Sequence, residues 1–156
     1  DDTRRISLFK SIKNKKFLIV GNGKAYLHPT YIDDVVQGFL LVTDNQAAFG
    51  EVYNIAGPAP ITVDEFVNTI ASTLQVAAPP FKIPKPIGVL AATGFELLSK
   101  ITGKAPFVSK SKIEFLTEDH GTDISKAKVQ LGYEPEYDFK KGIQLTIDWY
   151  NSNKHL

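Results

Sequence analysis

The sequence contains no cysteine and no methionine. Without cysteine, a disulfide framework, a cysteine-ligated zinc site and a thiol nucleophile are all excluded. No apolar run approaches the roughly 20 residues that a membrane-spanning helix needs, and the N-terminal residues lack the apolar core of a signal peptide. We therefore expect a soluble, cytoplasmic protein with no membrane partner. Methionine is missing even at position 1, which favours a piece of a longer chain over a complete small protein.

The remaining composition is that of an ordinary globular domain. A chain of 156 residues with 43% hydrophobic residues is long enough to bury a core as one domain. The net charge is +1, and nucleic-acid binding would need a clustered basic face. The densest basic run, Lys13, Lys15 and Lys16, is interpreted as a solvated helix end. We expect no nucleic-acid partner.

Hydrophobic periodicity predicts a mostly helical chain with a few short strands. Helices are expected over residues 3–13, 31–44, 62–74, 86–101, 109–117, 125–131 and 139–152. Strands are expected over residues 17–20, 25–30, 51–56 and 81–84. The first two strands flank Gly21-Asn22-Gly23, which is a turn signal, so residues 17–30 are expected to form a β-hairpin.

Capping residues support several of these helix boundaries. Thr62 and Glu65 have the spacing of a capping box, in which each side chain bonds a backbone N–H of the other end. Asp138 is a typical N-cap for the last helix, and Asp2 or Thr3 can cap the first. These caps mark where the helices are expected to begin.

Three segments in sequence order carry a resemblance to a known family. They are GNGKAYLHPTYIDDVVQGFLLV (21–42), GEVYNIAGPAPITVDEFVNTIASTL (50–74) and TDISKAKVQLGYEPEYDFKKGIQLTIDWY (122–150). Their order and spacing resemble the C-terminal part of extended short-chain dehydrogenases/reductases, the NAD-dependent epimerase/dehydratase family. The resemblance covers nearly the whole chain. It implies an α/β fold, α+β-like in this piece, in which residues 1–156 form a substrate-binding domain that normally packs against a Rossmann domain absent here.

The same resemblance implies where the cofactor and the catalytic groups belong. NAD or NADP would be bound mainly by the absent N-terminal Rossmann half. In this chain the only Gly-x-Gly, Gly21-Asn22-Gly23, leads into a strand and not into a helix, so it is a poor phosphate cradle. The family's Tyr-x-x-x-Lys dyad is also absent, because Tyr26 is followed by Thr30 and Tyr133 by Tyr137 at that spacing. We expect no catalytic, cofactor or metal site on this chain, which alone should be inactive.

The substrate class follows from a missing arginine. Members of the family that act on nucleotide sugars carry an arginine shortly before the Tyr-Ile-x-Asp helix, where a guanidinium can hold a diphosphate. Leu27 stands at that position, and KIEFLTEDHG offers no later arginine. The pattern is closest to the 3β-hydroxysteroid dehydrogenase-like branch, which implies an alcohol or ketone substrate. A nucleotide-sugar epimerase or dehydratase is the alternative.

The candidate substrate-binding residues are His28, Tyr31, Tyr26, Phe81 and Pro84. His28 could bond a substrate oxygen or cap backbone groups near Pro29, and Tyr31 could line the pocket or simply pack. The apolar helix 86–101 could be a substrate wall, a dimer face or core, with core or an interdomain seam favoured.

Other polar pairs and one aromatic residue are interpreted structurally. Asp33 and Asp34 oppose the dipole of the helix that they begin. Asp119-His120 is interpreted as a surface loop, and a hydrolase based on that pair is a weak alternative. Trp149 is expected on the inner or boundary face of the last helix.

The absence of the Rossmann half should leave part of the apolar surface of this chain uncovered. The strand 51–56 would return to the Rossmann sheet, so we expect exposed apolar surface over residues 31–56. The Rossmann domain, strand pairing or a second copy in a homodimer would cover it. The candidate partners are therefore a small-molecule substrate, the Rossmann domain and a second copy. A non-catalytic interaction module is the rival interpretation.

Overall fold

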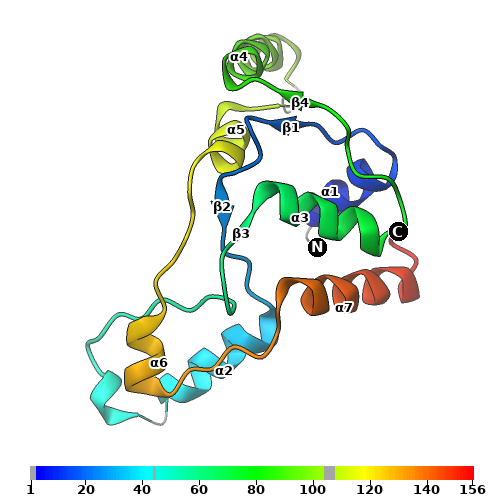
Figure 1. The fold of residues 1–156 in the computed structure, drawn as a ribbon. Helices are drawn as coiled ribbons and strands as arrows, with labels where there is room; N and C mark the ends of the chain where they lie inside the picture. Colours follow the sequence, from blue (N-terminus) through cyan, green and yellow to red (C-terminus); the bar gives the residue numbers. More distant parts are fainter. Residues whose placement is uncertain (1–2, 44, 104–107) are drawn as a thin grey trace. The chain divides into compact units, whose positions relative to one another are not determined.

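The computed structural model describes residues 3–43, 45–103 and 108–156, which form a mostly helical α/β fold (Figure 1). Its elements are α1 (Thr3–Lys13), β1 (Ile19–Val20), β2 (Tyr26–Leu27), α2 (Ile32–Thr43), a 3₁₀ turn η1 (Gln46–Ala48), β3 (Ile61–Thr62), α3 (Val63–Thr73), β4 (Lys82–Ile83), α4 (Lys85–Thr102), α5 (Lys110–Thr117), α6 (Ser125–Leu131) and α7 (Phe139–Ser152). All seven predicted helices are confirmed, with boundaries within two residues.

The predicted β-hairpin over residues 17–30 is wrong. The glycine turn exists, and Gly23 has a left-handed φ of +75°. However, β1 pairs in parallel with β4, and β2 pairs with β3. The backbone that follows the turn is hydrogen-bonded to α3. The carbonyl oxygens of Gly23 and Ala25 each accept an N–H from the first turn of this helix at 2.9 Å. Turn residues set the change in direction, and distant segments supply the partners.

The chain divides into two compact units, neither of which is continuous in sequence. Unit 1 comprises the residues up to Tyr26 together with Thr62–His120. Unit 2 comprises Leu27–Ile61 and Gly121–Leu156. The backbone passes from one unit to the other three times, so each unit needs segments that are far apart in the sequence.

In unit 1, α4 packs through its small residues and exposes its large ones. A Cβ on Gly88 would lie 2.5 Å from the Val20 side chain, so only glycine allows this approach of α4 to β1. Ala92 is fully buried in a cluster with Val20 and Ile113. The exposed large side chains of the helix are Ile87, Leu90, Phe95, Leu97, Leu98 and Ile101. This helix is therefore not ordinary core, and its interpretation as an interdomain seam stays a prediction.

The core of unit 2 is built on α6 and the segment that follows it. Its buried cluster contains Ala48, Ala56, Ile124, Ala127, Leu131 and Tyr133. Tyr53 and Ile55 of the segment 51–56 pack against it, but this segment has no regular secondary structure and no ladder partner among the described residues. The predicted strand there is not formed in this chain.

The last helix follows its sequence pattern with one exception. Asp138 accepts the Lys141 N–H at 2.7 Å as the N-cap. Ile143, Ile147 and Tyr150 are buried, as predicted. Trp149 is 57% exposed, so its prediction as an inner or boundary residue is wrong.

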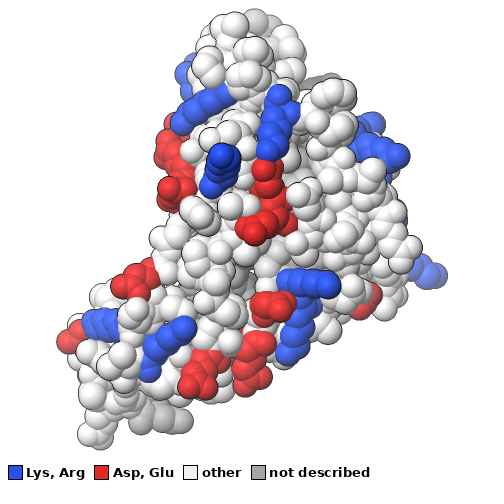
Figure 2. All heavy atoms as spheres, viewed as in Figure 1, with Lys and Arg blue, Asp and Glu red and all other residues white. Residues whose placement is uncertain are grey.

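Acidic and basic side chains are interspersed on the face that Figure 2 shows, with no tract of one sign. Lys13, Lys15 and Lys16 are exposed, as expected for a solvated helix end. Within the described ranges, no helix is both long enough and apolar enough to cross a membrane.

Candidate functional site

His28 fastens three loops of unit 2 through both of its ring nitrogens. The Thr122 N–H donates to Nδ1 at 3.1 Å, and Nε2 lies 2.9 Å from the carbonyl oxygen of Gly57. Since an amide N–H can only donate, Nδ1 is the acceptor and Nε2 carries the proton that goes to Gly57. This is the backbone-capping alternative for His28. Contact with a substrate oxygen would need one of these bonds to be exchanged.

The same junction depends on a close backbone approach at Gly57. Gly57 is buried, and a Cβ there would collide with the carbonyl oxygen of Pro29. The loop that carries His28 and the loop that carries Gly57 therefore lie in direct contact. Any larger residue would push the two loops apart.

Tyr133 anchors the end of the segment 51–56. Its side chain is fully buried, and its hydroxyl donates to the carbonyl oxygen of Ala56 at 2.9 Å. Burial, and secondarily the negative charge of Asp34, raise the pKa of Tyr133 to about 12. The hydroxyl thus stays protonated and serves as a permanent donor.

Asp34 is a buried carboxylate that holds the chain before α7. It is 1% exposed and accepts the N–H groups of Glu136 at 2.8 Å and Tyr137 at 3.3 Å. The prediction that Asp34 acts mainly on its own helix dipole missed this role. Two charge-assisted hydrogen bonds to backbone satisfy the buried charge and fix the register of two segments about 100 residues apart.

Exposed polar side chains tie residues 45–57 to α6. Lys126 Nζ donates to Glu51 at 2.7 Å and to the carbonyl oxygen of Val52 at 3.0 Å. The hydrogen bond from Lys126, aided by its charge, lowers the pKa of Glu51. The Tyr53 hydroxyl donates to the side chain of Gln130 at 2.9 Å. The segment is thus held by side chains, while its backbone edge has no strand beside it in the described chain.

Tyr31 packs within unit 2. Its ring stacks on Tyr137 with centroids 4.5 Å apart. Lys141 Nζ lies 4.0 Å from the centroid of the Tyr137 ring, and a hydrogen bond with Asp33 is the main cause that raises the pKa of Tyr137. Tyr31 is half-buried, which leaves part of the ring accessible.

Tyr26 belongs to unit 1, where its backbone joins the Asp119-His120 loop. The Tyr26 N–H donates to the Asp119 carboxylate at 2.9 Å, and its carbonyl oxygen accepts the His120 N–H at 2.7 Å. His120 also stacks on Phe115. Because Asp119 binds backbone and both residues are exposed, the surface-loop interpretation is confirmed. The Tyr26 side chain is 46% exposed.

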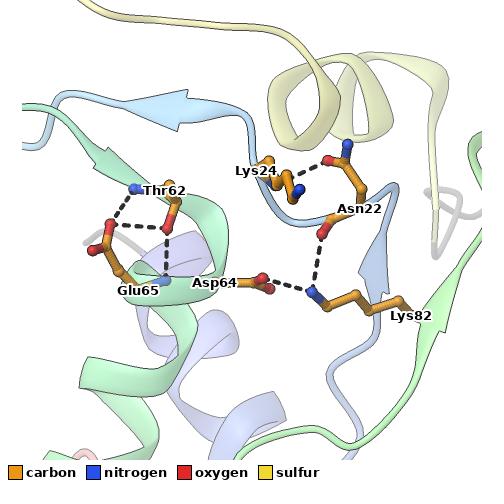
Figure 3. Close-up of polar contacts among 6 residues, drawn as sticks. All are labelled: Asn22, Lys24, Thr62, Asp64, Glu65 and Lys82. Atoms are coloured by element: carbon orange, nitrogen blue, oxygen red, sulfur yellow. Dashed lines mark hydrogen bonds and ion pairs between the residues drawn. The ribbon is translucent and has the colours of Figure 1, made fainter.

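Lys82 links the glycine turn to the start of α3, as Figure 3 shows. Its Nζ donates to the carbonyl oxygen of Asn22 at 2.9 Å and to the Asp64 carboxylate. The predicted capping box lies beside it: Thr62 Oγ1 accepts the Glu65 N–H at 3.2 Å, and Glu65 accepts the Thr62 N–H at 2.7 Å. The Thr62 N–H, and secondly the Thr62 hydroxyl, which donates to the Glu65 carboxylate at 2.8 Å, lower the pKa of Glu65.

A cleft of about 530 Å³ lies next to this network. Its lining residues are Gly21, Asn22, Lys82, Pro84, Lys85 and Thr117. Of the predicted substrate-binding residues it contains Pro84. Phe81 is not part of the lining, and it is 70% exposed just before β4. Tyr26, Phe81 and Pro84 thus belong to unit 1 and His28 and Tyr31 to unit 2, and neither unit alone brings all five together.

A second, apolar groove of about 570 Å³ runs along α2. Its lining residues are Asp33, Val36, Gln37, Leu40, Leu41, Asn45 and Leu131. Gln37 Oε1 is buried there and has no hydrogen-bond partner in the described chain. Over residues 31–56 the exposed large apolar residues are Ile32, Val36, Phe39, Leu40, Phe49 and Val52. The predicted exposed apolar surface over residues 31–56 is confirmed.

The fit to a dinucleotide can be tested on the glycine turn. A pyrophosphate site needs free N–H groups at a helix start. Here the turn leads into β2, and the Gly23 oxygen and the Asp64 side chain fill the space around the first turn of α3. The residues of this turn therefore do not fit a dinucleotide. No group of three His, Asp or Glu side chains suited to a metal occurs in the described ranges.

The structural roles of two residues were not predicted from the sequence. Asp34 and Tyr133 both bind backbone far away in the chain, and nothing in their immediate neighbours marks that partner. The sequence offers little indication of these roles. Asp34 follows Asp33, which could by itself oppose the helix dipole. Tyr133 follows Gly132, whose capping role explains the local pattern without a distant partner.

No family model matches the chain, but individual proteins do. It is 31% identical to 3beta-hydroxysteroid-dehydrogenase/decarboxylase isoform 1 of Arabidopsis thaliana, over 90% of this chain and 35% of that protein. It is 29% identical to N-acetyl-alpha-D-glucosaminyl-diphospho-ditrans,octacis-undecaprenol 4-epimerase of Escherichia coli O157:H7, over 92% of this chain and 43% of that protein. The chain spans less than half the length of the curated relatives it matches.

Solved structures match the fold over nearly the whole chain. The crystal structure of gox2253 superposes with a TM-score of 0.72 at 20% identity, over 99% of this chain and 45% of that one. UDP-glucuronic acid 4-epimerase of Bacillus cereus, in complex with UDP-glucuronic acid and NAD, gives a TM-score of 0.62 at 20% identity, over 94% of this chain and 38% of that one. At sequence identities this low, the superpositions show a shared fold and nothing about function.

Proposed function

We propose that this chain, a homologue of extended short-chain dehydrogenases/reductases of the NAD-dependent epimerase/dehydratase family, is the C-terminal, substrate-binding portion of such an enzyme. The enzyme would act on an alcohol or ketone and not on a nucleotide sugar. NAD or NADP, held by a Rossmann half, would supply the hydride acceptor or donor. The residues of this chain would bind the substrate and exclude water around it.

The observation that carries this proposal is the apolar face of α2. Phe39 and Leu40 are 70% and 62% exposed, and the groove beside them holds the unpaired Gln37 oxygen. Exposed apolar side chains next to an unsatisfied buried acceptor support an interface at this face. The Rossmann half is the proposed occupant, with the free edge of 51–56 supplying a strand to its sheet.

The proposed substrate class rests on the position of Leu27. Leu27 is 3% exposed in β2, so it presents no polar group to a ligand at the place where relatives on nucleotide sugars carry an arginine. A diphosphate would lose its guanidinium partner there. A substrate without phosphate loses nothing by the same replacement.

Within this chain the proposed roles divide by exposure. The Tyr26, Phe81 and Pro84 side chains are exposed and would contact the substrate directly. Tyr31 would contribute the accessible part of its ring. His28, whose ring nitrogens are both engaged, would position the loop between β2 and α2.

The test uses the full native enzyme that contains this chain. It is assayed against a panel of ketones with NADH and NADPH, and in parallel against UDP- and dTDP-sugars. We expect reduction of ketones with NADH or NADPH, no turnover of nucleotide sugars, and no turnover by residues 1–156 alone. Rapid epimerisation or dehydration of a nucleotide sugar would overturn the substrate assignment.

An exposed apolar side chain on another helix gives a control for a substitution in the proposed site. Phe81→Ala should raise KM about tenfold, since a substrate contact by an exposed ring is lost without loss of core. Val129→Ala removes an 84% exposed apolar side chain of α6, outside both the proposed site and the apolar face of α2, and should leave KM unchanged. Equal KM values for the two variants would remove Phe81 from the substrate site.

A further inference from the structure

The cleft of unit 1 beside β4 is lined by basic and neutral residues only. Its volume is about 530 Å³, and its lining residues are Gly21, Asn22, Lys82, Pro84, Lys85 and Thr117. Two of these six carry a positive charge, and the lining contains no acidic residue. A negatively charged group that enters the cleft therefore meets cations and no carboxylate of the wall.

Lys82 is a fixed part of this wall. Its Nζ donates to the carbonyl oxygen of Asn22 at 2.9 Å and to the Asp64 carboxylate, as Figure 3 shows. Asp64 neutralises its charge, and only one of the three ammonium N–H groups is left for a ligand. Lys82 thus shapes the cleft and supplies little free charge.

Lys85 has a much looser partner. Its Nζ lies 3.7 Å from Glu118 Oε1, which is beyond the length of a hydrogen bond. The two side chains are 46% and 58% exposed, so water screens this ion pair and its contribution is small. Glu118 is not part of the lining. When its side chain turns into solvent, the Lys85 ammonium offers all three of its N–H groups to the cleft.

Asn22 supplies a second donor. Its Oδ1 accepts the Lys24 N–H at 2.9 Å, so the other terminal atom of this side chain is the NH₂ nitrogen. Figure 3 shows this nitrogen turned away from Lys24, and it makes no hydrogen bond within the described chain. One ammonium and one amide donor match the two oxygens and the single charge of a carboxylate. A phosphate dianion has twice that charge and three terminal oxygens.

We propose that this cleft binds a carboxylate of the substrate, which displaces Glu118 from Lys85 and accepts a second hydrogen bond from Asn22. The inference rests on the proposed function and narrows its substrate class to an alcohol or ketone that also carries a carboxylate. Pro84 lines the same cleft and would contact the apolar part of that molecule.

Benzoate and benzamide test the site without turnover, because they share their shape and differ in charge. Ligand-observed NMR titrations use the full native enzyme saturated with NAD. We expect benzoate to bind about tenfold more tightly than benzamide, and Lys85→Met to abolish this difference. Glu118→Gln removes the competing carboxylate and should tighten benzoate binding about threefold. Lys100→Met, at an exposed position near the other end of α4, is the control and should change neither affinity.

The opposite signs expected for Lys85→Met and Glu118→Gln separate a binding role from damage to the fold. Benzoate binding that Lys85→Met does not weaken would overturn the proposal, as would binding that Glu118→Gln weakens. Phenyl phosphate that binds through Lys85 more tightly than benzoate would assign the cleft to phosphate and overturn the carboxylate.

Turnover of 4-oxocyclohexanecarboxylate and of its methyl ester tests the link to the substrate. The KM of the acid should be about tenfold below that of the ester in the native enzyme, and the two should be equal in Lys85→Met. Equal KM values in the native enzyme would overturn the assignment of the cleft to the substrate. If neither ketone reacts while benzoate binding still depends on Lys85, the ketone reaction of the proposed function fails and the carboxylate site stands.

Discussion

Replacing Tyr133 by phenylalanine isolates the hydrogen bond that fixes residues 51–56 to the core of unit 2. The substitution removes one oxygen and leaves the ring volume in place, so it creates no cavity. What is lost is the 2.9 Å bond from a fully buried hydroxyl to the carbonyl oxygen of Ala56. A buried acceptor deprived of its donor costs about 1–3 kcal/mol. We expect the free energy of unfolding to fall by about 2 kcal/mol at pH 8.

Tyr53→Phe is the matched control. Its hydroxyl makes a bond of the same length, 2.9 Å, to the Gln130 side chain, but at an exposed site. Water replaces that partner when it is lost, so the expected cost is below about 0.5 kcal/mol. Urea unfolding followed by circular dichroism measures both variants on the same scale.

The pH dependence gives the prediction a sign. The pKa of Tyr133 is raised to about 12 in the folded chain, against about 10 when unfolded. The unfolded chain therefore releases the proton first, and the stability that the neutral hydroxyl contributes is complete below pH 10 and is lost as the pH rises toward 12. The advantage of the native protein over Tyr133→Phe should shrink by about 1.2 kcal/mol between pH 9.5 and pH 11. A constant difference over this range, or equal costs for Tyr133→Phe and Tyr53→Phe, would refute the reasoning.

Three further substitutions test the packing by urea unfolding. Asp34→Ala should cost about 3 kcal/mol, because it leaves two backbone N–H groups unpaired in a buried site, while Asp33→Ala at the exposed neighbour should cost well under 1 kcal/mol. Thr62→Ala should cost about 1 kcal/mol by removing half of the capping box, and an unchanged midpoint would show that the box contributes nothing. Gly57→Ala should cost about 2 kcal/mol through collision with backbone. Gly121→Ala, where a Cβ meets nothing within 4 Å, should be neutral, and equal midpoints for the two glycine variants would contradict the close loop contact.

Helix boundaries were predictable because their causes are local. The Thr62–Glu65 capping box and the Asp138 N-cap lie within three residues of the groups that they bond. Strand partners were not predictable in the same way. The turn after β1 has the glycines of a hairpin, but the partner of β1 is β4, about 60 residues later. A two-residue strand gains little stability from pairing in a hairpin, so tertiary packing determines which strand it pairs with.

For the candidate site, the structural role of a loop residue could be predicted from the sequence, but its hydrogen-bond partners could not. His28 was weighed as a backbone cap, and both of its ring nitrogens do bind backbone, although Gly57 and Thr122 could not be named from the sequence. The exposed apolar face of α2 was expected from the absent half. The inverted packing of α4 was not, because the same apolar residues would describe a buried helix equally well.

The interwoven course of the chain has a consequence for its biosynthesis. Asp34 can accept its hydrogen bond only after Glu136 has been synthesised, and the carbonyl oxygen of Ala56 can accept its own only after Tyr133 has been synthesised. Unit 2 therefore cannot close while the ribosome is still making unit 1, and its early apolar helix must leave the exit tunnel without the residues that will hold it. We expect nascent chains halted near residue 120 to bind chaperones through residues 32–43, and to release them once α6 and Tyr133 have emerged.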